Sequence, residues 1–293
     1  MISPDQLLHQ VWGFAGFRPG QEEIVQAVIA GQNTLAIMPT GGGKSLCFQL
    51  PALCRDGVTV VISPLIALMR DQVRALKAAG VEAGALTSGN TEEETEEVFA
   101  ALDEGRLKLL YLAPERLAAP ATVPMLRRIG VSLIAVDEAH CVSQWGHDFR
   151  PEYRGLTVLH ERFAGVPRVA LTATADPRTR EEIRARLQLE QGRLFLASFD
   201  RPNIRYHIVE KQEVRKQLLQ LLRQEHAGDA GIVYCLSRNK VDETAEFLCA
   251  QGIEALPYHA GLGPAVRAKN QSRFLREDGI VMAIELQEFD FTA

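Results

Sequence analysis

Short apolar runs alternate with amphipathic segments along the first two thirds of the chain. Each run is rich in Val, Ile and Leu, as strands buried on both faces of a sheet are, and the segments between the runs carry apolar residues at helical spacing. The predicted strands cover residues 33–37, 58–63, 107–112, 131–136 and 169–172, and the predicted helices cover residues 3–12, 19–30, 46–53, 64–79, 92–104 and 177–189. This alternation predicts an α/β fold in which a mostly parallel sheet has helices on both faces.

The same rhythm resumes after a polar, turn-rich stretch at residues 199–204. The elements predicted there are helices 211–226, 239–251 and 264–276 and strands 231–235, 255–258 and 280–283. A chain of 293 residues is long enough for about two domains. We therefore predict one domain over residues 1–198 and a second, smaller one over residues 199–293.

A glycine-rich loop follows the first predicted strand, where residues 38–45 read Met-Pro-Thr-Gly-Gly-Gly-Lys-Ser. Strand, glycine loop, Lys-Ser and helix in this order form a phosphate cradle, because glycine backbones approach an anion closely and N–H groups at the helix start point at it. Met38 stands where the usual pattern opens with glycine. The alternative is a glycine-rich turn with an incidental lysine. The residues expected to hold the nucleotide are Thr40, Gly41, Gly42, Gly43, Lys44 and Ser45, with Lys44 on the β- and γ-phosphates and the Ser45 hydroxyl on Mg²⁺.

Two acidic residues, Asp137 and Glu138, directly follow the apolar strand at residues 131–136. Because the carboxyl ends of parallel strands share one edge of a sheet, we expect this pair near the glycine loop. There Asp137 holds Mg²⁺ through water, and Glu138 orients or deprotonates the attacking water. The alternative is an acidic helix start, since Asp also caps helices.

Aromatic and charged residues crowd the segment after the acid pair, which includes Trp145, His147, Phe149, Arg150 and Tyr153. Aromatic faces stack on nucleic-acid bases, and arginine pairs with phosphate. The segment therefore fits a nucleic-acid contact that reports to the hydrolysis site. A loop pinned by buried aromatic side chains is the alternative.

The amino-acid composition of the chain argues against several classes of function. The chain is 46% hydrophobic and 24% charged with a net charge of −5, which argues against a protein coated in nucleic acid but leaves room for a local basic groove. No apolar run is long enough to span a bilayer, and no export signal is visible at the N-terminus. The five cysteines include no pair at C-x-x-C spacing, so zinc is not expected.

The motifs together resemble the RecQ family of superfamily 2 DNA helicases. Residues 137–153 match that family's Walker B motif and aromatic-rich loop nearly residue for residue, and residues 14–21 resemble its adenine-reading motif. By this resemblance Gln21 hydrogen-bonds the adenine edge, Arg18 packs near it, and Phe14 supplies an aromatic wall. The implied fold is a RecA-like P-loop domain, with a parallel sheet and helices on both faces, followed by an incomplete second RecA-like domain.

The resemblance continues in order through residues 63–72, 113–117, 171–175, 234–238 and 258–262. Hydroxyls and arginines at strand ends suit phosphate contacts that carry no sequence information. Thr87 and Ser88 are less direct candidates, and for His259 a packed or capping role stays open. The residues implied to contact DNA or to couple it to the nucleotide are Ser63, Arg70, Gln144, Trp145, His147, Asp148, Phe149, Arg150, Thr172, Ser237, Arg238 and His259.

The resemblance implies an ATP-dependent DNA helicase that moves 3′ to 5′ on single-stranded DNA in recombination and repair. ATP and Mg²⁺ are the implied cofactors, and single-stranded and partly duplex DNA are the implied partners. A monomer in the cytoplasm, at the bacterial nucleoid and away from membranes, is expected. RNA is a substrate elsewhere in the superfamily, and only the close likeness selects DNA. A P-loop enzyme for a small metabolite is a further alternative, which the aromatic segment disfavours.

The likeness ends after residue 283, because residues 284–293 depart from the family's pattern. We expect from this a truncated or frameshifted product without the family's arginine finger, zinc-binding region or winged helix. An arginine finger contributes about 10³–10⁵ in turnover, so hydrolysis is expected to be slow. The alternative function is an ATP-binding, DNA-binding module without unwinding activity.

Overall fold

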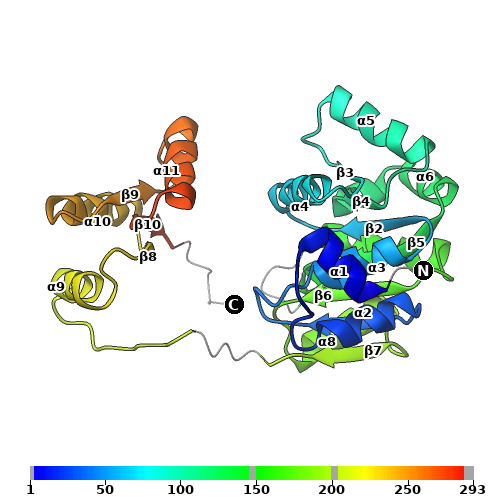
Figure 1. The fold of residues 1–293 in the computed structure, drawn as a ribbon, viewed down its shortest axis with the longest axis horizontal. Helices are drawn as coiled ribbons and strands as arrows, with labels where there is room; N and C mark the ends of the chain where they lie inside the picture. Colours follow the sequence, from blue (N-terminus) through cyan, green and yellow to red (C-terminus); the bar gives the residue numbers. More distant parts are fainter. Residues whose placement is uncertain (1–2, 145–149, 199–203, 287–293) are drawn as a thin grey trace. The chain divides into compact units, whose positions relative to one another are not determined.

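The computed structural model describes residues 3–144, 150–198 and 204–286, and the chain divides into two compact units, Met1–Ile204 and Arg205–Ala293. Unit 1 is built on a seven-stranded parallel sheet with the strand order β3-β4-β2-β5-β6-β1-β7 (Figure 1). Its strands are β1 (Thr34–Ile37), β2 (Val58–Ile62), β3 (Ala83–Leu86), β4 (Leu109–Leu112), β5 (Val131–Val136), β6 (Arg168–Thr172) and β7 (Arg193–Leu196). The predicted α/β class with a parallel sheet is confirmed.

Helices connect the strands and cover the sheet. The α-helices of unit 1 are α1 (Pro4–Trp12), α2 (Gln21–Ile29), α3 (Leu46–Cys54), α4 (Ile66–Ala78), α5 (Glu92–Asp103), α6 (Thr122–Arg128), α7 (Thr157–Arg162) and α8 (Pro177–Arg186). Short 3₁₀ helices are η1 (Pro114–Ala118), η2 (Ala139–Val142) and η3 (Pro151–Leu156). The first turn of α1 begins with a capping box in which the Ser3 hydroxyl accepts from the Gln6 backbone N–H at 3.2 Å.

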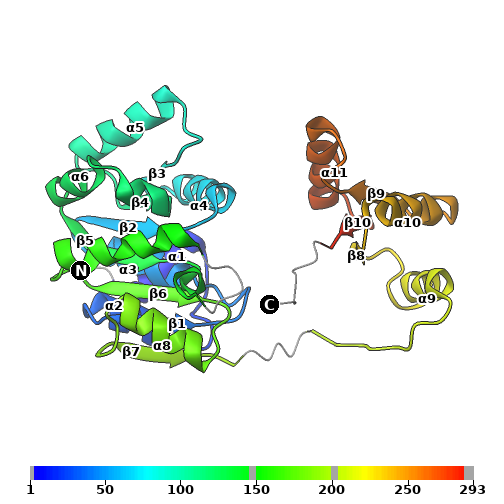
Figure 2. The ribbon, with the colours of Figure 1, turned by 180° about the vertical axis from the view of Figure 1, so that it is seen from behind.

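Alternate residues of the strands fill two separate cores, one on each face of the sheet. On β1, Leu35 and Ile37 join the core that includes side chains of α5, α6 and α8, whereas Ala36, and Met38 just after the strand, join the core that includes side chains of α2, α3 and α4. Figures 1 and 2 show these helices and the sheet from opposite sides. Because successive side chains of a strand point to opposite faces, both faces need apolar residues. This explains why the strands are uninterrupted apolar runs.

Two strands were not predicted from the sequence, and both lie at the edges of the sheet. Among the described residues, β3 pairs only with β4, and β7 pairs only with β1. β3 consists of Ala, Gly, Ala and Leu, of which the small residues have little strand preference, and three of the four β7 side chains are exposed. Neither segment therefore carries the apolar signal that marks the central strands.

A buried polar network ties together the helix after the glycine loop, the next helix and a central strand. The Tyr111 hydroxyl on β4 donates to Oε1 of Gln72 on α4 at 2.9 Å. Nε2 of Gln49 on α3 donates to the Tyr111 hydroxyl at 3.1 Å and lies 3.3 Å from Oε1 of Gln72. Burial raises the pKa of Tyr111, so its hydroxyl stays protonated and can donate. The network fixes α3 and α4 against the sheet.

Unit 2 is smaller and carries a three-stranded parallel sheet with the order β8-β10-β9. Its elements are α9 (Val214–Gln220), the π-helical turn η4 (Leu221–Glu225), β8 (Gly231–Cys235), α10 (Arg238–Ala250), β9 (Ala255–Tyr258), α11 (Pro264–Arg276) and β10 (Val281–Glu285). Its core gathers apolar residues of α10 and the sheet, among them Val241, Leu248 and Val281. In the described parts of both units, no helix is long and apolar enough to cross a bilayer.

Candidate functional site

The glycine loop joins the end of β1 to the start of α3. Gly41 and Gly43 both have φ of +79°, in the left-handed region that side chains other than glycine rarely adopt. A Cβ on Gly42 would lie 2.9 Å from the Pro39 carbonyl oxygen. Ser45 stands at the N-cap of α3, and within the described residues its hydroxyl accepts no capping hydrogen bond from a helix N–H. The loop thus needs its glycines, and the hydroxyl of Ser45 is left for a ligand.

Gln21 and Arg18 brace this loop through its carbonyl groups. Nε2 of Gln21 donates to the carbonyl oxygen of Gly43 at 3.1 Å and lies 3.3 Å from that of Gly42, and the Arg18 guanidinium donates to the Gly41 carbonyl. Because the C=O and N–H of a trans peptide point in opposite directions, the N–H groups of Gly43 and Lys44 face away from Gln21. No backbone acceptor for these two N–H groups occurs among the described residues. They form a cradle for an anion.

Two of the predicted adenine-reading residues, Arg18 and Gln21, therefore contact the glycine loop. Gln21 is only 3% exposed, and its Oε1 accepts from the Arg18 backbone N–H at 2.8 Å. Phe14, which precedes α2, is 48% exposed. Sequence reasoning did not anticipate the bracing of the loop, because the partners are 21 to 23 residues apart.

A substitution at Gly43 should test the bracing. An alanine Cβ there would overlap Nε2 of Gln21, and the φ of +79° would be strained by any side chain. We expect Gly43→Ala to weaken binding of a fluorescent ATP analogue by about tenfold or more, which corresponds to about 1.4 kcal/mol. Gly165→Ala is the matched control, since a Cβ there meets no atom within 4 Å among the described residues and Gly165 lies outside the proposed nucleotide site. Equal affinities of the two variants would contradict the bracing.

The acid pair follows β5 at the same edge of the sheet. The Asp137 N–H donates to the Ile62 carbonyl at 2.8 Å, and Oδ1 of Asp137 accepts from the Glu138 N–H at 3.0 Å. The Tyr153 hydroxyl donates to the Asp137 carbonyl at 3.1 Å, so this residue of the aromatic segment positions the acid pair. Asp137 is 4% exposed. These three hydrogen bonds fix the backbone around Asp137.

Burial and charge repulsion raise the pKa of Asp137 to about 6. Burial is the larger cause and the neighbouring Glu138 carboxylate the next, while Lys44 acts in the opposite direction. The negative charge of a buried carboxylate next to a second carboxylate is not fully compensated by the protein. A hard cation such as Mg²⁺ supplies the missing positive charge. Within the described residues, no three His, Cys, Asp or Glu side chains cluster as a metal site. The residues therefore fit a cation that shares its ligands with a bound phosphate.

Glu138 has an unusual backbone for its residue type, with φ of 46° and ψ of 49°. Its carboxylate Oε2 lies 3.3 Å from Nδ1 of His140, and the same nitrogen lies 2.8 Å from Oγ1 of Thr172 at the end of β6. Thr172 in turn donates to the Thr174 carbonyl at 3.1 Å. Strained backbone of this kind persists where surrounding contacts hold it. The contacts join the acid pair to the predicted coupling segment at residues 171–175.

The unit 1 residues that are predicted to contact DNA differ in their burial and in their hydrogen-bond partners. Ser63 is buried, and its hydroxyl has no hydrogen-bond partner among the described residues. Arg150 donates to the Pro64 carbonyl at 3.2 Å, which ties the aromatic segment to the turn after β2. Gln144 is exposed. Four predicted contacts lie outside the described residues, namely Trp145, His147, Asp148 and Phe149.

Sequence reasoning missed Glu182 on α8, which anchors the residues before the aromatic segment. Its Oε2 accepts from the Ser143 hydroxyl at 2.6 Å and from the Gln144 N–H at 3.1 Å, and its Oε1 accepts from Arg186 at 2.8 Å. Burial acts to raise the pKa of Glu182, but these hydrogen bonds lower it overall. No local pattern distinguishes Glu182 from the other charges of α8. Glu182 lies next to Ser143 only because the tertiary fold places α8 beside that residue.

In unit 2 the predicted residues are held by contacts of their own. Ser237 caps α10 by accepting from the Lys240 N–H at 3.4 Å, and Arg238 pairs with Glu285 at 3.4 Å. His259 is buried, with Nε2 3.1 Å from Asp242 and Nδ1 accepting from the Gly261 N–H at 3.2 Å. Both ring nitrogens of His259 are therefore engaged within unit 2.

Comparison with known proteins gives a consistent result. The family model described as DEAD/DEAH box helicase matches residues 18–183. The chain is 48% identical over 272 residues to the ATP-dependent DNA helicase RecQ of Pasteurella multocida and 43% identical over 278 residues to that of Bacillus subtilis. These alignments include 93% and 94% of this chain but 43% and 47% of the relatives, so the chain spans less than half their length.

Among solved structures, the helicase domain of Pyrococcus furiosus Hef is similar, with a TM-score of 0.64 and 15% sequence identity. The alignment covers 97% of this chain and 88% of that one. At this identity the likeness concerns the fold alone.

Proposed function

Because the chain belongs to the DEAD/DEAH box helicase family and, within it, to the RecQ helicases, we propose that it is the motor region of an ATP-dependent DNA helicase. Residues 1–198 act as the ATP-binding RecA-like domain, and residues 199–293 belong to the second RecA-like domain. The protein moves 3′ to 5′ along single-stranded DNA and serves recombination and repair in the cytoplasm, at the nucleoid. The observation that carries the proposal is a braced glycine loop on the same sheet edge as a buried acid pair.

We assign a role to each residue of the nucleotide site. Lys44 holds the β- and γ-phosphates, and the loop N–H groups cradle them. Ser45 would hold Mg²⁺ directly and Asp137 would hold it through water, and the ion would neutralise phosphate charge. Glu138 orients the attacking water and accepts its proton. Phe14, Arg18 and Gln21 surround the adenine, and Arg18 and Gln21 already contact the loop.

The DNA path follows the strand ends, where Arg70 and other predicted residues meet backbone phosphates. Such contacts bind without reading sequence. The His140–Thr172 contact links this path to the acid pair, because Thr172 ends β6 and His140 lies beside Glu138. DNA is favoured over RNA because the RecQ relatives are named as DNA helicases.

The test uses the full chain with Mg²⁺ and ATP. ATP turnover is measured alone, with single-stranded DNA and with single-stranded RNA, and strand separation is measured on duplexes with a 3′ or a 5′ tail. We expect turnover that DNA stimulates more than RNA, and separation that requires the 3′ tail. Turnover indifferent to both nucleic acids would contradict a helicase. Nucleotide-dependent DNA binding without strand separation would favour a DNA-binding module.

A further inference from the structure

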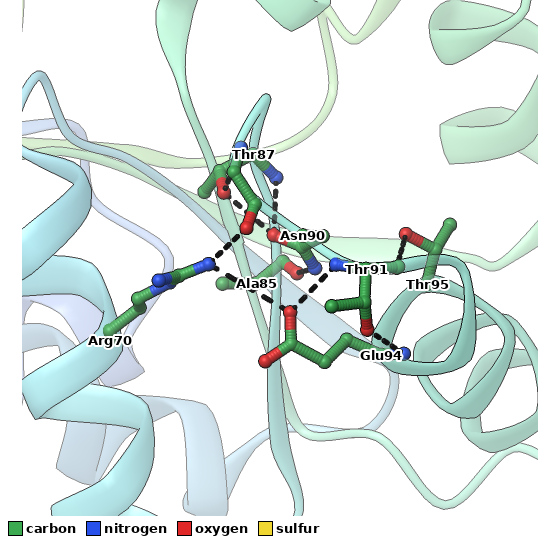
Figure 3. Close-up of polar contacts among 8 residues, drawn as sticks. Arg70, Ala85, Thr87, Asn90, Thr91, Glu94 and Thr95 are labelled. Atoms are coloured by element: carbon green, nitrogen blue, oxygen red, sulfur yellow. Dashed lines mark hydrogen bonds and ion pairs between the residues drawn. The ribbon is translucent and has the colours of Figure 1, made fainter.

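Arg70 on α4 is held by the segment between β3 and α5 (Figure 3). Its Nη2 donates to the Gly89 carbonyl and lies 3.8 Å from Oε2 of Glu94. No partner for Nε or Nη1 of Arg70 occurs among the described residues. The guanidinium therefore has one edge fixed by protein and one edge that is open to an anion.

The turn that supplies the Gly89 carbonyl is closed by its own side chains. Oδ1 of Asn90 accepts from the Thr87 hydroxyl at 2.6 Å and from the Thr87 N–H at 3.1 Å, and Nδ2 of Asn90 donates to the Ala85 carbonyl at 2.7 Å (Figure 3). The Gly89 N–H donates to Oγ1 of Thr87 at 3.2 Å. Thr87 thus orders the turn with its hydroxyl, and the turn holds Arg70 in place.

Glu94 is fixed as firmly as the turn, because it completes a capping box. The Thr91 N–H donates to Oε2 of Glu94 at 3.0 Å, and the Glu94 N–H donates to the Thr91 hydroxyl at 3.1 Å. The same Oε2 faces Arg70 (Figure 3). The carboxylate therefore stays near Arg70 without help from the arginine.

The two helices do not pack closely at this point. A cavity of about 280 Å³ separates α4 from α5, and its lining includes Arg70, Lys77, Glu94 and Glu97. Ion pairs bridge it at Arg70–Glu94 (3.8 Å) and Lys77–Glu97 (3.2 Å). The Arg70 and Glu94 side chains are 45% and 53% exposed. A phosphate can reach Arg70 from solvent while the Glu94 charge remains beside it.

We propose that Glu94 sets how strongly Arg70 holds a nucleic-acid phosphate, by placing a fixed negative charge next to the arginine. The Gly89 carbonyl positions the guanidinium, and the Glu94 carboxylate repels an anion that approaches its open edge. The result is a contact weak enough to be released, as a moving protein needs. The inference deepens the proposed function and rests on it, since it assigns Arg70 to the DNA path.

Glu94→Gln tests the inference cleanly. Glutamine also completes a capping box, so α5 keeps its start while the charge is lost. We expect this variant to bind a fluorescent single-stranded DNA oligonucleotide about two- to fivefold more tightly at low salt, with a difference that shrinks as salt is added. The matched control is Glu97→Gln, which removes the same charge from the same helix beside Lys77. It should tighten binding by less than half as much.

A double-mutant cycle with Arg70→Gln shows whether the effect passes through the arginine. Glu94→Gln should no longer tighten binding when Arg70 is absent. Binding by Glu94→Gln that is no tighter than by Glu97→Gln, or tightening that persists without Arg70, would overturn the inference and leave the proposed function intact. Failure of the wild-type chain to bind single-stranded DNA in any nucleotide state would overturn both.

Discussion

Replacement of Lys44 by alanine should lower ATP turnover by about 10²-fold or more, because it removes the one ammonium at the start of α3. Lys44 directly follows Gly43 in the braced loop. Burial raises the pKa of both Asp137 and Cys47, and the charge of Lys44 partly offsets the rise in each. The charge therefore reaches the edge where the acid pair lies. Its loss removes the phosphate contact and leaves the buried Asp137 less compensated. Steady-state ATP hydrolysis at saturating Mg²⁺ measures the effect.

The control for Lys44→Ala is Lys216→Ala. Lys216 lies on α9 of unit 2, where it is 80% exposed and pairs with Glu213 at 2.9 Å. Loss of an exposed ion pair changes stability little, so this variant should keep its turnover. Tryptophan fluorescence verifies that unit 1 stays folded, because both tryptophans of the chain, Trp12 and Trp145, belong to it. Unchanged hydrolysis in Lys44→Ala would rule out the glycine loop as the nucleotide site.

Glu138→Gln should separate nucleotide binding from hydrolysis. Loss of the carboxylate that accepts the proton of the attacking water should reduce turnover by about 10²–10⁴-fold. ATP binding should persist or tighten, because Glu138 is the second cause, after burial, of the raised pKa of Asp137. Without that repulsion, less free energy is needed to keep Asp137 ionised, so its contact with the metal strengthens. Single-turnover hydrolysis and titration with a fluorescent ATP analogue measure the two quantities.

Glu246→Gln is the control for the loss of a carboxylate. Glu246 is exposed on α10 of unit 2, and its replacement should leave both quantities unchanged. If Glu138→Gln lost binding and turnover in parallel, the residue would act in nucleotide binding or in the fold. If it lost neither, the general base would have to be sought elsewhere.

Much of the candidate nucleotide site could be read from short stretches of sequence. The apolar runs at β1 and β5 identified two buried strands, and the residues after them are the glycine loop and Asp137. Strand ends of a parallel sheet share an edge, so the site followed from local pattern. The contacts of Gln21 with Gly43 and of Ser143 with Glu182 could not be read in this way. Neither α2 nor α8 carries a local signal for its partner.

The sequence by itself determined the class of fold and pointed to the residues proposed to bind phosphate, because apolar alternation and glycine spacing are properties of short stretches. Only the tertiary structure decided the edge strands β3 and β7 and the residues that each functional side chain contacts. Those depend on where the chain returns: β7 exists because residues 193–196 pair with β1, and Arg70 meets Glu94 because β3 brings α5 beside α4. Partners that are 20 to 160 residues apart are fixed by packing of the whole sheet, which no local pattern encodes.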